Sequence, residues 1–169
     1  DALQALLAHR REGVARGEDG AVKAYVLPPG GDDTRGARLA NLLMAQGIEV
    51  HRSTGALSVS ATSRLDAEGE GDQQFAADTY VISMSQPAST LAHALLHPHF
   101  DMEANFTAEQ ERLEARREGT EFYDLTAWSL PLLFGVEAWS LGALPEGELA
   151  PMTPGAATSN AAPLREAPP

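Results

Sequence analysis

Four metal-ligand side chains alternate along one short segment of the chain. His97, His99, Asp101 and Glu103 are spaced two residues apart, so an extended backbone would place all four on one face. Imidazole and carboxylate groups together can bind a divalent metal. The segment also contains Pro98 and follows a predicted helix, which favours a solvated loop. We therefore expect no metal ligand here, and a recruited metal site at this cluster stays as an alternative.

Two further histidine patterns could bind a metal. His9 and Glu12 have the H-x-x-E spacing with which zinc carboxypeptidases supply two metal ligands. The two arginines between them would repel a cation, and a pattern with only two fixed positions often arises by chance. His93 lies one helical turn before His97 and could join its cluster, although we expect His93 on the solvent face. Neither pattern is predicted to bind a metal.

A glycine-rich turn separates a predicted strand from a predicted helix. Gly30 and Gly31 stand where doubly wound folds bind phosphate. Asp32 and Asp33 follow directly, and their carboxylates would compete with a phosphate for the helix N-terminus. The G-x-G-x-x-G spacing is also absent from the chain. The turn is therefore predicted to be structural.

The sequence offers no activated nucleophile. It contains no cysteine and no G-x-S-x-G elbow. Trp128 and Trp139 could stack on a sugar or a peptide, but they stand among leucines and are predicted to be packing residues. The serines considered, none with an activating sequence context, are Ser83, Ser85, Ser129 and Ser140. We expect no catalytic or cofactor-binding residue in this chain.

Composition narrows the classes of partner. The chain has 169 residues and a net charge of −12, which repels phosphate backbones and anionic lipid. We therefore expect neither nucleic-acid nor membrane binding. No apolar run approaches the ~20 residues that span a bilayer. Hydrophobic residues make up 43% of the chain, which permits a packed core.

The hydrophobic pattern predicts the elements that would position these residues. Two buried strands flank a helix that ends at Gly47, which indicates a strand–helix–strand unit with parallel strands. Leu91, Leu95 and Leu96 are the predicted inner face of a later helix, and residues 66–74 are a predicted acidic loop. We expect three parts: a helical lead-in over 1–20, an α/β domain over 21–142 and a Pro/Ala-rich linker or tail over 143–169. Strands are predicted at 23–28, 48–52, 57–62, 79–84 and 136–141, with 23–28 and 48–52 parallel in one sheet.

Four blocks of sequence resemble one known family. In order they are KAYVLPP, ANLLMAQGIEVHR, DTYVISMSQPASTLAHALL and FYDLTAWSLPLLFGVEAW, within residues 23–141. Their order and spacing resemble the accessory domain that follows the catalytic domain of large bacterial zinc carboxypeptidases. That domain is similar in fold to class I glutamine amidotransferases. The resemblance implies an α/β fold with a mostly parallel central sheet and helices on both faces, in flavodoxin-like layering.

The resemblance also implies a role without catalysis. The zinc of such a protein is bound by the peptidase domain, which is the expected partner in the same polypeptide, and the parent protein is expected to be exported. An amidotransferase of this class needs a cysteine nucleophile, which this chain lacks. We therefore expect a non-catalytic accessory domain. The alternatives are a ligand-binding module for a peptide or sugar, with its site at the strand C-termini, and a degenerate amidotransferase-like enzyme with a metal site at His97–Glu103.

Overall fold

A computed structural model describes residues 2–30, 32–65, 70–98 and 129–157 of the chain. The helices are α1 (Ala2–Asp19), α2 (Asp33–Ala45), α3 (Ser89–Leu96) and α5 (Leu130–Phe134). The strands are β1 (Ala24–Leu27), β2 (His51–Ser53), β3 (Leu57–Arg64), β4 (Glu70–Phe75), β5 (Tyr80–Ser83), β6 (Trp139–Leu141) and β7 (Leu149–Pro151). A capping box at residues 107–110 predicts a helix over about 107–117, which lies outside the described residues.

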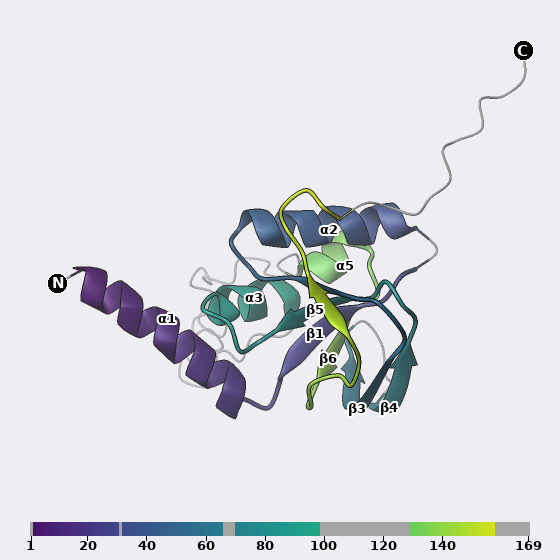
Figure 1. The fold of residues 1–169 in the computed structure, drawn as a ribbon, viewed down its shortest axis with the longest axis horizontal. Helices are drawn as coiled ribbons and strands as arrows, with labels where there is room; N and C mark the ends of the chain where they lie inside the picture. The colour runs from purple at the N-terminus through teal and green to yellow at the C-terminus, as the bar shows by residue number, and fades with distance from the viewer. Residues whose placement is uncertain (1, 31, 66–69, 99–128, 158–169) are drawn as a thin grey trace, which may run out of the picture.

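The seven strands form one sheet in the order β4-β3-β6-β1-β5-β2-β7. Every pairing between these strands is antiparallel. The central strand β1 places Leu27 opposite Tyr80 of β5 and Val26 opposite Trp139 of β6. The C-terminal end of β1 therefore lies beside the N-terminal ends of β5 and β6 (Figure 1).

The predicted fold class is wrong. The sheet is antiparallel and curled into a half-barrel, whereas a mostly parallel sheet with helices on both faces was expected. The strands expected at 23–28, 48–52 and 79–84 do share one sheet. However, β5 lies between β1 and β2 and pairs antiparallel with both. β1 and β2 thus run in the same direction without being neighbours.

The error arises because a short strand that is buried on both faces has the same continuous apolar sequence in a parallel and in an antiparallel sheet. All four residues of β1 are buried, as parallel strands usually are. Here one face of β1 is covered by helices, and the other faces the inside of the curl. Tyr25 and Leu27 join the first core cluster, whereas Ala24 and Val26 join the second.

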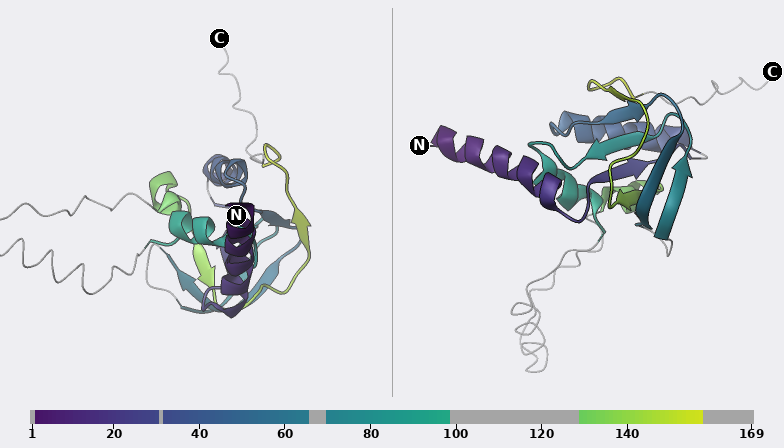
Figure 2. Two further views of the ribbon diagram at one scale, coloured as in Figure 1. Left: turned by 90° about the vertical axis from the view of Figure 1, so that its left-hand side faces the viewer. Right: turned by 60° about the horizontal axis from the view of Figure 1, so that its bottom comes forward.

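The two core clusters lie on opposite faces of the sheet. The first combines alternate residues of β1 and β5 with buried residues of α2 and α3, against which α5 also packs. The second contains strand residues alone among the described part of the chain, and its members are Ala24, Val26, Leu57, Val59, Phe75, Val81, Trp139 and Leu141. Figure 2 shows the curl of the strands.

A bulge and a bridge shape the curl. The register of β3 against β4 shifts between Val59 and Thr62, and Ala61 within the shift has a φ of 54°. Such bulges bend a strand and increase its twist. A separate antiparallel bridge joins Ser58 to Glu146, which precedes β7. The segment before the edge strand β7 therefore contacts β3, which lies next to β4, the strand at the opposite edge of the sheet.

Two predicted irregular segments contribute strands. β4 occupies residues 70–75, and all but its last residue belong to the predicted acidic loop over 66–74. β7 lies within 143–169, the expected linker or tail, and pairs with β2. The side chain of Asn41 on α2 also donates to the carbonyl of Ala157 at 2.8 Å. Neither segment contains a β-branched aliphatic or aromatic residue, which is why the hydrophobic pattern did not reveal the strands.

Helix ends follow the local sequence closely. Gly47 has a φ of 79° just after α2, as predicted for a left-handed glycine at that place. Gly135 ends α5 with a φ of 60°. The sequence predicts Asp33 as the N-cap of α2. The N-cap is instead Asp32, whose side chain accepts from the backbone N–H of Thr34 at 3.1 Å. α5 begins one residue before Pro131, where a proline costs no hydrogen bond.

The turn before α3 is held by a buried glutamine. Gln86 accepts from the backbone N–H of Glu49 at 2.7 Å and donates to the carbonyl of Ser83 at 2.6 Å. These bonds join the turn before α3 to Glu49, which lies two residues before β2, and to the end of β5. The buried face of α3 consists of Ser89, Ala92 and Leu96. Leu91, expected on the inner face, is exposed.

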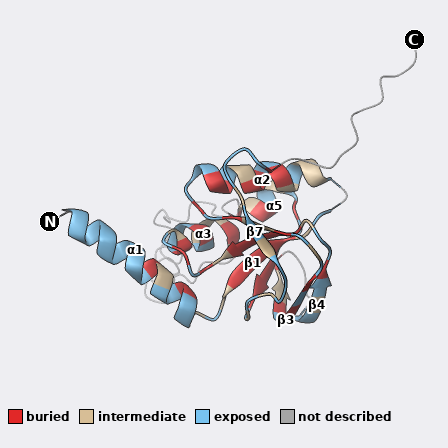
Figure 3. Ribbon diagram, viewed as in Figure 1, coloured by how far each residue is buried: buried red, intermediate tan, exposed pale blue. Residues whose placement is uncertain are grey.

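Among the described residues, the C-terminal half of α1 packs on the body. Gly13 and Gly17 are its buried residues among those described, and the side chain of Ser89 donates to the Gly13 carbonyl at 2.6 Å. The side chain of Arg16 donates to Thr90 on α3 at 3.1 Å. The rest of the helix projects beyond the sheet and is exposed along most of its length (Figure 3).

Candidate functional site

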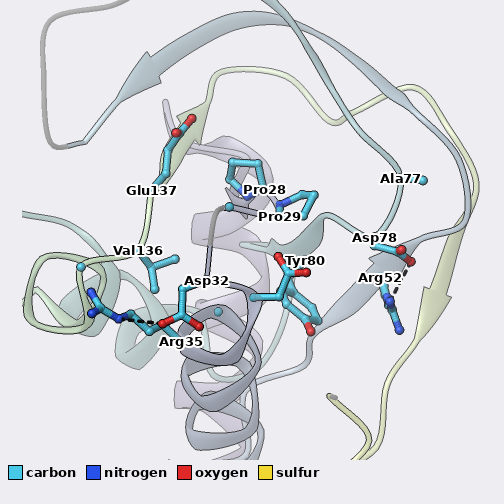
Figure 4. A pocket seen from close by; sticks show the side chains of 14 residues that line it. Pro28, Pro29, Asp32, Arg35, Arg52, Ala77, Asp78, Tyr80, Val136 and Glu137 are labelled. Carbon is cyan, nitrogen blue, oxygen red and sulfur yellow. Dashed lines mark ion pairs between the residues drawn. The ribbon is translucent and has the colours of Figure 1, made fainter. Parts of the chain in front are cut away.

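A cavity of about 310 Å³ lies at the end of the sheet where β1 finishes and α2 begins (Figure 4). It exists because antiparallel pairing gathers turns from several elements at this end. Pro28, Pro29 and Gly30 come from the turn after β1, and Gly36 from α2. The charged and polar side chains around the cavity are Asp32, Asp33, Arg35, Arg52, Asp78, Tyr80 and Glu137.

Four acids and two arginines give the cavity a formal charge of −2. Three of the acids form salt bridges: Asp78 with Arg52 at 2.8 Å, Asp32 with Arg35 at 3.2 Å, and Glu137 with Arg64 at 3.7 Å. Glu137 accepts from the indole N–H of Trp139 at 2.8 Å. Asp33 forms no salt bridge among the described residues. The surplus negative charge disfavours an anionic ligand.

Two buried side-chain atoms of cavity residues have no hydrogen-bond partner among the described residues. They are Oδ1 of Asp33 and Nε of Arg52. Tyr80, which also lines the cavity, is exposed over only 7% of its surface. Burial raises the pKa of the Tyr80 hydroxyl above its usual value. Unpaired buried polar atoms such as these two are costly to the folded state.

Asp78 has an unusual backbone conformation beside the cavity. Its φ is 70°, in the left-handed region, which aspartate adopts more readily than most residues. Its N–H donates to the Ser53 carbonyl at 3.1 Å, which fixes the turn before β5. The conformation holds its carboxylate against Arg52 at the cavity wall.

A second polar cluster joins α3 to the centre of the sheet. The hydroxyl of Tyr25, a fully buried residue of β1, lies 2.7 Å from Nδ1 of His93 and 3.2 Å from Nδ1 of His97. The two imidazole rings stack with centroids 4.8 Å apart. His93 is exposed, as expected, and it also lies beside His97. His99, Asp101 and Glu103 lie outside the described residues.

The Tyr25 cluster predicts a loss of stability at alkaline pH. Burial raises the pKa of Tyr25 above its usual value. Above about pH 10 the unfolded chain ionises this phenol while the folded state keeps it neutral. The unfolding free energy should therefore be insensitive to Tyr25 below that pH and then fall by up to ~1.4 kcal/mol per pH unit.

Denaturant unfolding of the wild type and of Tyr25→Phe from pH 8 to 12 measures this effect. The substitution should flatten the alkaline slope by about one proton per molecule. Tyr80→Phe serves as the comparison, since burial also raises the pKa of Tyr80, by a smaller shift. Equal slopes for the wild type and Tyr25→Phe would show that the phenol ionises freely in the fold.

The other sequence candidates have ordinary structural positions. His9 and Glu12 are both exposed on α1. Ser129 donates to the Leu96 carbonyl at 3.2 Å, and Ser140 to the Ser63 carbonyl at 3.4 Å. Ser85 donates to Glu18 at 3.2 Å, and the Ser83 hydroxyl accepts from the Ser85 N–H at 3.2 Å.

Trp139 is confirmed as a packing residue. It is buried in the second core cluster and meets the ring of Phe75 edge-on, with centroids 5.8 Å apart. Trp128, which we also predict to be buried, lies outside the described residues.

Comparisons with known proteins found no match for this chain. It matches no family model, no curated protein and no solved structure. Among the described residues, no helix is long and apolar enough to cross a membrane. Within the same ranges, no three His, Cys, Asp or Glu residues gather where they could hold a metal ion.

The sequence indicates one side of the cavity and not the other. The turn from Gly30 to Asp33 stands out in the sequence because it follows a predicted strand and precedes a predicted helix. Arg52, Asp78 and Tyr80 carried no local signal, because they reach the cavity only through the antiparallel pairing of β5 with β1 and β2. Knowledge of that pairing would have been needed to find them.

Proposed function

We propose that this chain is a non-catalytic accessory domain of a zinc carboxypeptidase-like protein, which packs on the peptidase domain of the same polypeptide through α1. The observation that carries the proposal is the apolar stripe on α1. Leu6 and Leu7 are 49% and 46% exposed, and Leu3 beside them is also exposed. Apolar residues at helical spacing favour burial against a further surface.

The exposed stripe continues the packed face of the same helix. Gly13 lies seven residues after Leu6, two turns along the same side. At Gly13 and Gly17 the helix packs against the segment Met84–Ser89, where a methyl group would clash with backbone atoms. The C-terminal half of α1 is therefore packed on this domain, and the leucines further along the same side remain exposed and could pack on a second domain. The resemblance of the four sequence blocks supports a peptidase domain as that partner.

The experiment compares two variants in the longer polypeptide that would carry both domains. Leu6→Glu combined with Leu7→Glu should separate the domains and expose their junction to limited proteolysis. Leu144→Glu is the matched control, because Leu144 is also an exposed leucine, 61% accessible, but lies in the loop before β7. Zinc-dependent release of C-terminal amino acids should come from the longer polypeptide and not from this chain alone.

Two outcomes would overturn the proposal. Equal proteolysis of both variants would mean that the leucines of α1 contact no adjoining domain. Peptide or glutamine hydrolysis by this chain alone, abolished by His97→Ala, would favour the alternative of an enzyme with a recruited metal site.

A second candidate function is a ligand-binding module for a peptide or sugar. The cavity at the start of α2 favours it, because its lining combines charged side chains and Tyr80 with apolar walls from Pro28, Pro29 and Val136. Its volume is at the lower limit of typical small-molecule sites. Saturable binding of a small peptide or sugar by the chain would support this function.

A further inference from the structure

We infer that a cavity between α1 and α3 binds a small carboxylate that carries a short apolar chain. The cavity has a volume of about 280 Å³ and lies where the C-terminal end of α1 and the turn before β1 meet the N-terminal half of α3. The two helices lie side by side there (Figure 1). This cavity shares no described lining residue with the cavity at the start of α2. A ligand bound here is therefore independent of both proposed functions.

The walls of this cavity are largely apolar. Met84 belongs to the first core cluster, and Val22 packs against the same cluster. Gly17 brings no side chain into the space. Ser89 is buried, and its hydroxyl already donates to the Gly13 carbonyl at 2.6 Å. An apolar chain that entered the cavity would therefore leave water and contact the edge of the core.

An arginine without a carboxylate partner stands beside these walls. Arg16 is exposed, so a ligand from solvent can reach it, and it forms no salt bridge among the described residues. One of its N–H groups donates to the Thr90 hydroxyl at 3.1 Å, which holds the guanidinium between α1 and α3. A guanidinium has several N–H donors, so others remain for a ligand.

The described lining of this cavity carries positive charge only. Arg16 is its one residue with a fixed charge, and His93 adds either no charge or a positive one. The chain as a whole has a net charge of −12, and a separate cavity over β3 and β4 is lined by Asp72 and Glu146 without a described base. An anion is therefore repelled there and at the start of α2, but is attracted to Arg16.

The charge and the walls together select an apolar carboxylate. A carboxylate matches the planar fork of a guanidinium, which can donate two parallel hydrogen bonds to it. One cation balances one negative charge, which favours a carboxylate over a phosphate. The volume is just below the usual range of small-molecule sites, so it suits a short acyl chain or one apolar side chain. A short-chain fatty acid and the apolar C-terminal residue of a peptide share this chemistry.

NMR titration of the full chain with matched probes tests the inference. Octanoate has both groups, octanamide keeps the chain without the charge, and acetate keeps the charge without the chain. We expect octanoate to bind with a dissociation constant of about 1 mM or tighter. It should shift the methyl signals of Val22 and Met84, which line the cavity, and not those of the exposed Leu144. Octanamide and acetate should each bind about 10-fold more weakly or worse.

Two variants and one control show where the carboxylate binds. Arg16→Gln removes the charge, and Thr90→Glu places a competing carboxylate next to the guanidinium. Both positions are exposed, and an acid in the first turn of α3 favours the helix, so both variants should fold. Each should weaken octanoate binding by about 10-fold. Arg10→Gln, at another exposed arginine of α1 outside this lining, should leave binding unchanged. Circular dichroism of the three variants confirms that they are folded.

N-acetyl-leucine distinguishes the two sources of such a carboxylate. Binding tighter than that of octanoate would indicate a peptide C-terminus, and weaker binding would indicate a free fatty acid. Both results support the inference if Arg16→Gln weakens them.

Four outcomes would overturn the inference. Equal binding of octanoate and octanamide would mean that the charge has no part in recognition. Acetate that binds as tightly as octanoate would show an adventitious ion only. Binding that neither Arg16→Gln nor Thr90→Glu weakens would place the ligand elsewhere. Absence of binding by both octanoate and N-acetyl-leucine would show that the cavity holds no such carboxylate.

Discussion

Trp139→Ala should lower the unfolding free energy by about 3–5 kcal/mol, as truncation of a large buried aromatic does. The residue is only 7% exposed and belongs to β6, which connects β3 to β1. Its ring packs edge-on against Phe75, and the Arg64 guanidinium lies 5.8 Å from the ring centroid. Alanine would leave a cavity at the centre of the curl.

Urea unfolding of Trp139→Ala and Trp139→Phe measures this loss. Phenylalanine keeps a ring against Phe75 but loses the N–H that donates to Glu137, so its cost should be less than half that of alanine. An unfolding free energy lowered by under ~1 kcal/mol in Trp139→Ala would place the ring in solvent. That result would contradict the second core cluster.

Gly17→Ala should release α1 from the body of the domain. A Cβ at this position would lie 1.8 Å from the Met84 carbonyl oxygen and 2.1 Å from its carbon. Both atoms belong to the backbone just after β5, so no side-chain movement relieves the clash. The helix can move away more easily than the sheet can deform. The loss of unfolding free energy should be about 1–3 kcal/mol, the usual range for overpacking.

Amide hydrogen exchange of α1 tests this prediction. Protection over residues 2–19 should fall in Gly17→Ala while protection in β1 and β5 stays near its original level. Gly36→Ala is the matched control, because Gly36 is also helical but a Cβ there meets only a Tyr80 ring carbon at 3.7 Å. That control should be neutral or more stable by up to ~1 kcal/mol. Unchanged protection of α1 in Gly17→Ala would contradict its docked position.

Local signals in the sequence predicted local features well. Gly47 adopts the left-handed conformation expected for a glycine that ends a helix, and the apolar runs around Tyr25 and Ile82 are buried strands. Leu57 and Val59 alternate with serines, a pattern that is typical of an antiparallel strand, and β3 is antiparallel to β4. These features depend on neighbouring residues alone, which is why the sequence reveals them.

The direction of strand pairing could not be predicted in the same way. A strand, a helix and a second strand suggest parallel neighbours, but β5 enters between β1 and β2 from 27 residues further along the chain. The four-residue strands carry no feature that separates the two arrangements. The candidate cavity depends on this pairing. The sequence alone therefore indicates only the part of the cavity that the turn at Gly30 forms.

The central claim is that an adjoining domain covers the exposed leucines of α1, and side-chain oxidation by hydroxyl radicals tests it most directly. The reactivity of Leu6 and Leu7 is compared with that of Leu144 in this chain and in the longer polypeptide. We predict that Leu6 and Leu7 become several-fold less reactive in the longer polypeptide while Leu144 is unchanged. Equal reactivity of Leu6 and Leu7 in both forms would contradict the claim.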